Sequence, residues 1–379
     1  MKRLLIFSFY DKDGIVDQYI LFLLRGLKQV VNELIVVING MLKDEEEKKI
    51  VALTNHILKR KNVGYDAGAY ADVILNFLGK EELKKWDELV LCNDTFYGPF
   101  VPFEHIFNKM NLGKVDFWGL NYVENNITNH IQSYFLVFKK RIIESGLLFD
   151  YFYKEININE MDLLNVYASF EIGLFGYLVQ LGYKFGTYAV TDNYNIYSCA
   201  DICLERYELP ILKKKSFNGR FLELQQESKI LNYIISNTDY NPNFIISNVM
   251  RQYGKELSIN GVNEVNKDTI VEVEKRIPKS KISGEYLINF LKEKEEIYIY
   301  GNGNIARKIW KLYFKYMHTF RGFIVSDDKP VLKNELYGFP IYSYSTLKEG
   351  ITIVVGLDVK NSIEVRKNIK MGDEALFLW

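Results

Sequence analysis

The chain has 379 residues, which is enough for two domains of ordinary size. Hydrophobic residues make up 48% of it, so sizeable cores can form. Lys and Arg together number 48, as do Asp and Glu, and this balance argues against a nucleic-acid-binding protein. No apolar run reaches the roughly 18 residues that a membrane-spanning helix needs.

The three cysteines, Cys92, Cys199 and Cys203, match neither a disulfide framework nor a paired zinc motif, because their number is odd and the close pair is spaced C-x-x-x-C. This usage fits a reducing compartment. The apolar run LLIFSFY (4–10) ends at Asp11 and is too short for the core of a secretory leader. We therefore expect a cytoplasmic protein.

The N-terminal part alternates apolar runs of strand length with segments of helical spacing. Strands are predicted at 4–10, 33–40, 56–60 and 87–94, and helices at 14–31, 44–54 and 69–78. This order implies an α/β fold, with a parallel sheet covered by helices on both faces. Further along, the pattern predicts strands at 115–122 and 133–140, a helix at 170–182, and helices within 226–253 that break at 241–243.

The composition changes after residue 254. Residues 255–285 are polar and charged with little periodicity, which is typical of a linker. A second strand–turn–helix follows at 295–314, with more strands at 321–328 and 350–358. The sequence therefore predicts a first domain at 1–254, a linker at 255–285 and a small Rossmann-like α/β domain at 286–379.

Polar, glycine-containing clusters follow the predicted strands of the first domain. Each cluster alone is typical of an ordinary turn. Ligands of open parallel sheets, however, bind beyond the carboxyl ends of the strands, so the coincidence of the clusters predicts a binding site there. The clusters are Phe9–Gly14, Asn39–Gly40, Arg60–Asp66 and Asn93–Pro99.

The third cluster lies in RKNVGYDAGAY (60–70). Gly64 would let the backbone turn sharply, and Gly68 would let a ligand approach closely. Asp66 begins the next helix, where it either caps the backbone or contacts a ligand.

The fourth cluster, CNDTFYGPF (92–100), places Asn93 and Asp94 directly after a buried strand. A carboxylate there could hold Mg²⁺ or Mn²⁺ against the oxygens of a diphosphate. The alternative is an Asn-Asp turn that satisfies its own backbone.

Three further residues could contribute to chemistry. Glu171 precedes a long helical pattern, where it either stabilises the first turn through the helix dipole or acts as a general base. His130 and Gln132, in NHIQSYF, would point to one face by strand alternation.

The small C-terminal domain contains GNGNIAR (301–307) between a predicted strand and a helix, the context of a dinucleotide-binding turn. Gly301 and Gly303 would approach a nucleotide, and Asp327, at the end of the next strand, would contact its ribose. A domain of this size is only half of a full dinucleotide-binding fold. If the GNGNIAR turn nevertheless binds NAD(P), the protein would be an oxidoreductase or an epimerase, and this is the alternative function.

An ordered series of segments in residues 1–250 resembles the rhamnan synthesis F family of bacterial cell-surface polysaccharide glycosyltransferases. The series runs from YDKDGIVDQYILFLLRGLKQVVNELIVVING through RKNVGYDAGAY, LVLCNDTFYGPF, DFWGL, HIQSYFLVFKK and FEIGLFGYLVQLGYKF to ELPILKKKSF. The resemblance implies a GT-A-like domain that uses an activated sugar such as dTDP-rhamnose.

The resemblance also assigns roles. Donor binding falls to Phe9, Tyr10, Asn39, Arg60, Asn62, Gly64, Asp66, Asn93 and Asp94, and the acceptor or sugar side to His130 and Gln132. Asn93 and Asp94 stand in place of an Asp-x-Asp element, of which one carboxylate is missing. Glu171 stands where related glycosyltransferases carry an acid before a long helix, which favours it as the base.

The resemblance implies transfer of rhamnose or a similar hexose, with inversion, from a dTDP- or UDP-linked donor to a polysaccharide or lipid-linked glycan. Mg²⁺ or Mn²⁺ would assist at Asp94, and neither a redox cofactor nor nucleic acid is expected. A non-catalytic scaffold in polysaccharide assembly is a further alternative. Lys213, Lys214 and Lys215 form either a solvated charge run or a peripheral contact with the inner face of the cytoplasmic membrane.

Overall fold

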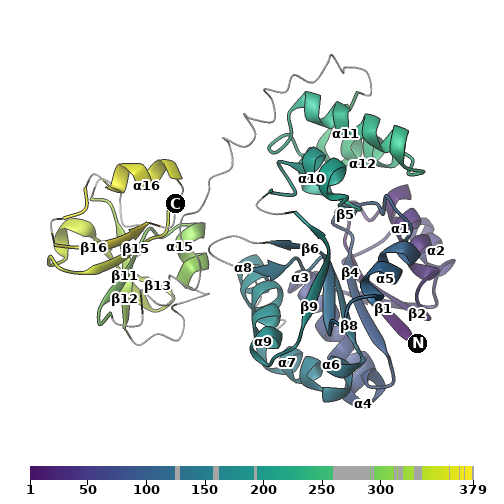
Figure 1. Ribbon diagram of the computed structural model, residues 1–379, viewed down its shortest axis with the longest axis horizontal. Helices are drawn as coiled ribbons and strands as arrows, with labels where there is room; N and C mark the ends of the chain where they lie inside the picture. Colours follow the sequence, from purple (N-terminus) through teal and green to yellow (C-terminus); the bar gives the residue numbers. More distant parts are fainter. Residues whose placement is uncertain are drawn as a thin grey trace. The chain divides into compact units, whose positions relative to one another are not determined.

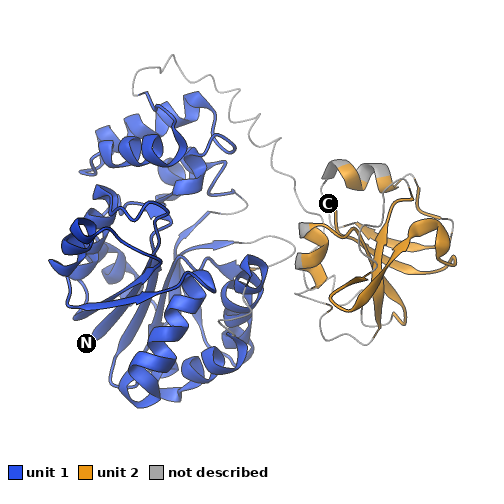
Figure 2. Ribbon diagram, turned by 180° about the vertical axis from the view of Figure 1, so that it is seen from behind, with its two compact units in different colours: residues 1–123, 130–274 blue, residues 124–129, 275–379 orange. Residues whose placement is uncertain are grey.

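The computed structural model describes residues 1–123, 129–156, 162–191, 194–258, 291, 294–310, 314, 319–327, 335–357, 359–366, 368–370 and 372–377. The chain divides into two compact units, residues 1–123 with 130–274 (unit 1) and residues 124–129 with 275–379 (unit 2) (Figure 2). Each unit is described by itself. Most of the predicted linker, 255–285, lies outside the described residues.

Unit 1 is built on one eight-stranded sheet in the order β3-β2-β1-β4-β8-β6-β7, with β9 also paired to β6 (Figure 1). Strands β1 to β4 are mutually parallel, and β8 and β6 continue the sheet in antiparallel pairings. The strands are β1 (Arg3–Phe9), β2 (Glu33–Asn39), β3 (His56–Arg60), β4 (Glu88–Asn93), β6 (Phe117–Val123), β7 (His130–Ile131), β8 (Phe135–Lys139) and β9 (Phe185–Val190).

Strand alternation divides the core of unit 1 into two layers. In β1, Leu5 and Phe7 belong to one layer, and Leu4 and Ile6 to the other. The first layer is covered by α1 (Gln18–Lys28), α2 (Asp44–Val51), α5 (Phe103–Asn111), α10 (Ala200–Tyr207), α11 (Leu224–Asn237) and α12 (Asn243–Tyr253). The second is covered by α3 (Tyr65–Ala71), α4 (Gly79–Leu83), α6 (Lys140–Ser145), α7 (Leu147–Glu155) and α9 (Leu174–Gln180).

Several shorter elements complete unit 1. Strands β5 (Phe96–Tyr97) and β10 (Leu212–Lys213) form a separate antiparallel pair. Helix α8 (Leu163–Asn165) precedes a π-helical segment, Val166–Gly173, and a second π-helical segment, Asp72–Leu78, follows α3. A 3₁₀ turn spans Lys214–Phe217.

The predicted fold class, a mostly parallel α/β sheet flanked by helices, is confirmed. The predicted helix at 14–31 is shorter, because α1 begins at Gln18. The preceding residues form a loop in which the Asp11 carboxylate accepts hydrogen bonds from the backbone N–H groups of Asp13 (3.0 Å) and Ile15 (3.1 Å). Arg251 of α12 holds this loop through an ion pair of 2.6 Å with Asp11.

Unit 2 has a six-stranded sheet in the order β13-β14-β12-β11-β15-β16, parallel except for the hairpin of β13 and β14. Helix α15 packs on one face through Ala306 and Ile309, and α16 packs on the other through Val365. The elements are β11 (Ile297–Tyr300), α15 (Asn304–Ile309), β12 (Phe320–Val325), β13 (Glu335–Leu336), β14 (Phe339–Ser343), a 3₁₀ turn at Tyr344–Thr346, β15 (Thr352–Val355), α16 (Val359–Arg366) and β16 (Glu374–Phe377). In the part of the chain that the structure describes, no helix combines the length and apolarity needed to cross a membrane.

Candidate active site

The sheet of unit 1 has a topological switch point beside β1. From β1 the chain runs to β2 and β3 on one side, and it returns to β4 on the other. At such a point the connections diverge and leave a crevice beyond the carboxyl ends of the two strands. The polar clusters predicted from the sequence follow these strand ends, and their side chains form the candidate site.

Arg60, at the end of β3, acts as a structural clamp. Its guanidinium donates to Oδ1 of Asn39 (2.7 Å) and to the carbonyl oxygen of Val63 (2.8 Å), and it forms an ion pair with Asp72. Asn39 in turn donates to Oγ of Ser8 (2.9 Å). Arg60 and Asn39, which the sequence assigned to donor binding, thus join the ends of β1, β2 and β3 and use their polar groups within the protein.

The turn after β3 requires glycine at two positions. Gly64 (φ +72°) and Tyr65 (φ +54°) are both left-handed, a conformation that is strained for a tyrosine. At Gly68, a Cβ atom would collide with the carbonyl oxygen of Val63 and would lie 3.1 Å from the Arg60 guanidinium. The packing of the turn against α3, and not a ligand, accounts for Gly68.

Asp66, in the first turn of α3, positions Asn93. Its carboxylate accepts hydrogen bonds from Nδ2 of Asn93 (2.7 Å) and from the backbone N–H of Ala67 (2.9 Å). Burial raises the pKa of Asp66, and the charge of Glu171 raises it further, against the lowering effect of these hydrogen bonds. Asp66 therefore stabilises the start of α3 and also joins the polar cluster at the end of β4.

Asp94 is paired with a buried lysine. The Nζ atom of Lys214 lies 2.9 Å from Oδ2 of Asp94 and donates to the hydroxyl of Tyr19 (2.6 Å). Burial opposes the charge of Lys214, but Asp94 outweighs it, so the pKa of the lysine is raised. The residues described contain no group of three or more His, Cys, Asp or Glu that could hold a metal ion. The contacts of Asp94 therefore do not fit the metal-binding role predicted for it.

Lys213 is the adjacent residue, but its surroundings differ. It is only 5% exposed, because β10 pairs with β5 and brings it opposite Phe96. Its Nζ atom donates to Oγ1 of Thr95 (2.5 Å) and lies 4.1 Å from the ring centroid of Tyr134. Burial lowers the pKa of Lys213 to about 7, although the charges of Glu171 and Asp66 favour its protonated form.

Glu171 lies inside the π-helical segment and not at a helix start, so its predicted role as a first-turn acid is wrong. The preceding turn is capped by Asp162, which accepts from the backbone N–H of Asn165 (2.7 Å). The Glu171 carboxylate meets Nε2 of His130 (2.9 Å) through one oxygen and accepts from Oγ of Ser133 (2.7 Å) through the other. Burial acts to raise the pKa of Glu171, but these hydrogen bonds and the charges nearby lower it.

Two buried polar atoms beside this cluster lack partners among the described residues. They are Oε1 of Gln132 and Nδ2 of Asn121. The hydroxyl of Tyr134, whose ring lies against Lys213, donates to Oδ1 of Asn121 (2.5 Å). Buried polar atoms are normally hydrogen-bonded, so, within the part of the chain that the structure describes, the amides of Asn121 and Gln132 each keep one unused hydrogen-bonding atom.

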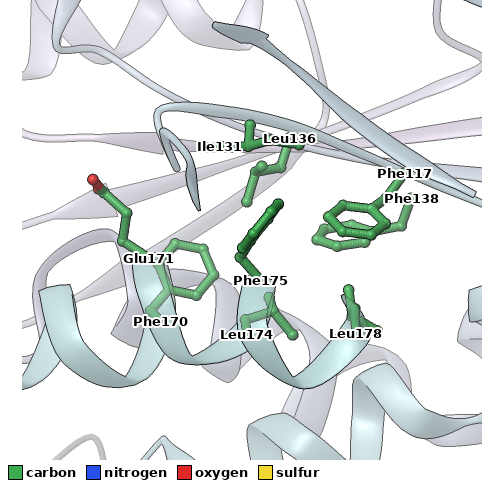
Figure 3. A pocket seen from close by; sticks show the side chains of 9 residues that line it. All are labelled: Phe117, Ile131, Leu136, Phe138, Phe170, Glu171, Leu174, Phe175 and Leu178. Atoms are coloured by element: carbon green, nitrogen blue, oxygen red, sulfur yellow. The ribbon is translucent and has the colours of Figure 1, made fainter. Parts of the chain in front are cut away.

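An apolar pocket lies beneath Glu171 (Figure 3). It is lined by side chains of β6, β7 and β8 and of the helical segment 170–178, and its volume of about 10 Å³ is far below that of a sugar. The carboxylate of Glu171 points away from the aromatic rings. The pocket is therefore part of the core that fixes the helix, and the carboxylate faces the polar cluster.

A family model described as rhamnan synthesis protein F matches residues 34–285, more than half of the chain. The chain belongs to the rhamnan synthesis protein F family. The resemblance drawn from the ordered motifs is thereby confirmed. The matched range contains Asp66, Asn93, Glu171 and Lys213.

Two curated relatives match parts of the chain. It is 29% identical over 120 residues to virulence protein VirA of Vibrio anguillarum, which covers 32% of this chain and 38% of the relative. It is 24% identical over 243 residues to the uncharacterized protein y4gN of Sinorhizobium fredii, which covers 63% of this chain and 56% of the relative. The chain thus spans 38% to 56% of the length of these two relatives.

Similar solved structures are distant. One is a cytidylyltransferase from Leptospira borgpetersenii, with a TM-score of 0.35 and 10% identity over 70% of this chain and 100% of that chain. Another is glucosyl-3-phosphoglycerate synthase from Mycobacterium tuberculosis in complex with Mn²⁺, UDP-glucose and phosphoglyceric acid, with a TM-score of 0.24 and 13% identity over 41% and 67%.

The other donor-binding residues predicted for this member of the rhamnan synthesis protein F family divide by exposure. Phe9 is 1% exposed and packs in the first core layer, so it does not flank a ligand. Tyr10 is 46% exposed and lies against Gly40, and Asn62 is exposed in the turn after β3. Among these predicted residues, the accessible ones beyond the strand ends are therefore Tyr10 and Asn62.

In unit 2, two of the three residues predicted for a second nucleotide site, Gly301 and Asp327, make close contacts within the protein. Gly301 (φ +112°) gives room to the carbonyl oxygen of Gly356, 2.9 Å from where its Cβ would be, and no atom lies within 4 Å of a Cβ added to Gly303. The Asp327 carboxylate accepts from the Oγ atoms of Ser343 (2.7 Å) and Ser345 (2.8 Å). Asp327 thus closes a local turn.

Lys213 and Lys214 are members of the polar cluster that the sequence patterns did not reveal. The interpretation of both as part of a solvated or membrane-facing charge run is wrong, because they are buried or nearly so. Only Lys215 of the run is exposed. The sequence does carry one indication of their burial: the run lies between the short apolar segments 210–212 and 216–217, which both belong in the core.

Proposed function

We propose that residues 1–254 form a glycosyltransferase domain. It would move rhamnose or a similar hexose from a nucleoside diphosphate sugar to a hydroxyl group of a growing cell-surface polysaccharide or a lipid-linked glycan. The observation that carries the proposal is the convergence of Glu171, Asp66, Asn93 and Lys213 beyond the ends of β1 and β4. Membership of the rhamnan synthesis protein F family supports a role in polysaccharide synthesis.

Glu171 is the general base in this proposal. Its lowered pKa keeps it ionised at neutral pH, and His130 and Ser133 fix its two oxygens. It accepts the proton of the acceptor hydroxyl while that oxygen bonds to the anomeric carbon and the bond from this carbon to the diphosphate breaks. A single displacement from the face opposite the diphosphate inverts the anomeric configuration.

The sugar of the donor binds beside Asn121 and Gln132. The Nδ2 group of Asn121 can donate to a sugar hydroxyl, and Oε1 of Gln132 can accept from one. A ligand that satisfies both atoms removes the free-energy cost of leaving them buried and unpaired. Sugars offer such paired donors and acceptors, so these two atoms favour a carbohydrate over an apolar ligand.

The nucleotide binds at the exposed rim of the crevice. Tyr10 and Tyr65 offer accessible aromatic rings for a dTDP or UDP base, and Asn62 offers polar contacts. The strained backbone of Tyr65 supports this assignment, because strain of this kind clusters at functional sites. Asp66 acts by holding Asn93 in place.

A divalent metal ion is not part of the proposed mechanism. Asp94, the carboxylate predicted to hold it, is neutralised by Lys214, and Asn93 is held by Asp66. In nucleotide sites, Mg²⁺ is usually held by one or two protein carboxylates together with water and the phosphates of the substrate, and the one carboxylate here is already paired with a lysine. The donor set at the end of β4 therefore does not fit a tightly bound ion.

A thermal-shift screen of the full chain with dTDP- and UDP-linked sugars, with and without Mg²⁺ or Mn²⁺, tests the proposal. We expect at least one such donor to raise the melting temperature of the wild-type protein. Asp66→Ala should lose this shift because it frees Asn93, whereas Glu81→Gln, an exposed change on α4, should keep it. Absence of a shift with every donor, or an undiminished shift in Asp66→Ala, would contradict the proposal.

A further inference from the structure

Lys213 is a buried cation whose hydrogen-bonding capacity is not used up by the protein. An ammonium group has three N–H donors. Within the described ranges, one donates to Oγ1 of Thr95 and no other acceptor is within reach. No carboxylate oxygen of those residues lies within the 4.0 Å of an ion pair with its Nζ atom. The neighbouring Lys214, in contrast, is paired with Asp94 and Tyr19.

A buried ammonium group with a single hydrogen bond destabilises the folded protein unless another interaction compensates for the lost hydration. Burial of a charged group without a partner is strongly disfavoured, and an apolar side chain of similar length would fill the same space without that cost. The ring of Tyr134, 4.1 Å from the Nζ atom, supplies a partial compensation. The two remaining N–H donors point to a ligand with several anionic oxygens.

We infer that Lys213 is the cation that binds the diphosphate of the donor and stabilises it as the leaving group, in the role that a divalent metal ion would otherwise have. This inference rests on the proposed function. It goes further because it names the group that contacts the reacting diphosphate. An ammonium placed at developing negative charge in a water-poor site favours the transition state.

The position of Lys213 agrees with this role. It lies beside Thr95, directly beyond the end of β4, where the diphosphate of a ligand at the switch point belongs. Lys214 pairs with Asp94, so the pair has no net charge and does not repel an anionic ligand. The unpaired Nδ2 atom belongs to Asn121, whose amide oxygen accepts from the hydroxyl of the Tyr134 ring beside Lys213, and the sugar would follow the diphosphate on this side.

Protonation of Lys213 links this role to pH. Burial holds its pKa at about 7 in the free protein, so it is only partly charged at neutral pH. The diphosphate would favour the charged form, so donor affinity should rise as the pH falls through 7. The carboxylates of Asp66, Asp94 and Glu171 favour the charged form of Lys213, and the charge of Lys215 opposes it. The thiol of Cys92 also lies within electrostatic range of Lys213, whose charge acts to lower the pKa of that thiol.

Isothermal titration of the full chain in EDTA, with inorganic pyrophosphate and with a dTDP- or UDP-sugar, tests the inference. Lys213→Met should weaken binding of both ligands roughly 10- to 100-fold, the worth of a lost hydrogen bond to a charged group. Lys215→Met, an exposed change in the same run, should leave both affinities unchanged. Thr95→Val removes the hydroxyl that orients Lys213, so it should weaken binding less and keep the lysine.

The pH arm uses the nucleotide sugar, whose two phosphates are esterified and do not titrate near neutral pH. From about pH 8 to about pH 6, the wild-type affinity should rise across the lysine pKa of about 7, and that of Lys213→Met should stay flat. Circular dichroism of each variant detects a defect in folding. A flat wild-type profile with undiminished affinity in Lys213→Met overturns the inference.

The outcomes also separate the inference from the proposed function. In a parallel titration with Mg²⁺ or Mn²⁺ and no EDTA, donor binding that appears only with the metal and that Lys213→Met leaves unchanged overturns the inference and leaves the glycosyltransferase proposal standing. Lysine-dependent binding of pyrophosphate without binding of any nucleotide sugar supports the anion site and contradicts the glycosyltransferase. Binding of neither ligand overturns both.

Discussion

Each unit places an aspartate beyond a parallel strand, yet the two aspartates have different surroundings. In unit 2, Asp327 is satisfied by Ser343, at the end of β14, and by Ser345, in the turn that follows it. In unit 1, Asp94 meets Lys214, and the cluster around it receives Glu171 and Lys213 from distant parts of the chain. The comparison teaches that the glycine-containing turn is a poor marker of a site. Charged side chains that come together from distant segments and are only partly paired are a better marker of a site.

The largest expected effect is on catalysis in unit 1. Glu171→Gln should lower the rate of sugar transfer roughly 10²- to 10⁴-fold, the range for loss of a general base, and leave donor affinity unchanged. Release of the nucleoside diphosphate in the presence of acceptor measures it. Because the pKa of Glu171 lies below its ordinary value of 4.5, the carboxylate stays ionised, and its titration should cause no change in wild-type activity with pH near neutrality.

Glu81→Gln provides the matched control, since Glu81 is exposed on α4 and pairs only with a surface lysine, Lys84. Its turnover should equal that of the wild type. Near-normal turnover in Glu171→Gln would exclude Glu171 as the base and weaken the contrast between the units.

The next effect is on stability, and it concerns the paired lysine. Lys214→Met leaves Asp94 buried beside an apolar chain, so the free energy of unfolding should fall by about 3 kcal/mol. Urea unfolding followed by circular dichroism measures it. Adding Asp94→Asn should recover part of the loss, because the unpaired charge is then gone. A stable Lys214→Met single variant would mean that Asp94 is hydrated and available to a metal ion.

The unpaired lysine should respond in the opposite direction. Lys213→Met removes a buried ammonium without an ion-pair partner, so the free energy of unfolding at neutral pH should rise by roughly 1–3 kcal/mol. The folded pKa of about 7 lies below the ordinary lysine pKa of 10.5. Between these values the unfolded chain binds more protons, and wild-type stability should therefore gain from Lys213 as the pH rises.

Urea unfolding at about pH 7 and about pH 9 checks both statements, since only the wild type carries this contribution. A Lys213→Met protein that is less stable than the wild type at neutral pH would show that the ammonium is a structural group. The contrast between Lys213 and Lys214 would then be lost.

The smallest effect is expected in unit 2. Gly303→Ala places a Cβ atom where no other atom lies within 4 Å, at a negative φ of −81°, so stability should change by no more than about 0.5 kcal/mol. Donor binding by the full chain should not change either. A dinucleotide at this turn would meet the new methyl group, so NADH binding that Gly303→Ala abolishes would restore the oxidoreductase alternative.

Local patterns predicted most of the fold. The alternation of apolar runs and helical spacing identified β1 to β4 and their helices, because the buried parallel strands are continuous apolar runs. The predicted ends of the elements were less accurate. Helix α1 begins four residues after its predicted start, because Arg251, from a helix far along the chain, holds the preceding loop. Long-range ion pairs leave no mark in a local pattern.

The site was predicted less well for the same reason. Strand ends located the crevice, and Asp66, Asn93 and Glu171 do lie in one cluster. Arg60 and Asn39, however, face each other, and Gly68 serves packing. A charged run reads as solvated in sequence, so the burial of Lys213 became visible only through the pairing of β10 with β5.

Hydrogen exchange of the full chain, with and without a bound nucleotide sugar, tests most directly which unit holds the donor site. We predict slower exchange in peptides that contain residues 64–71, 93–97 and 212–216, and no change at 301–306. Protection at 301–306, with none at 93–97 or 212–216, would place the nucleotide in unit 2 and contradict the donor site proposed for unit 1.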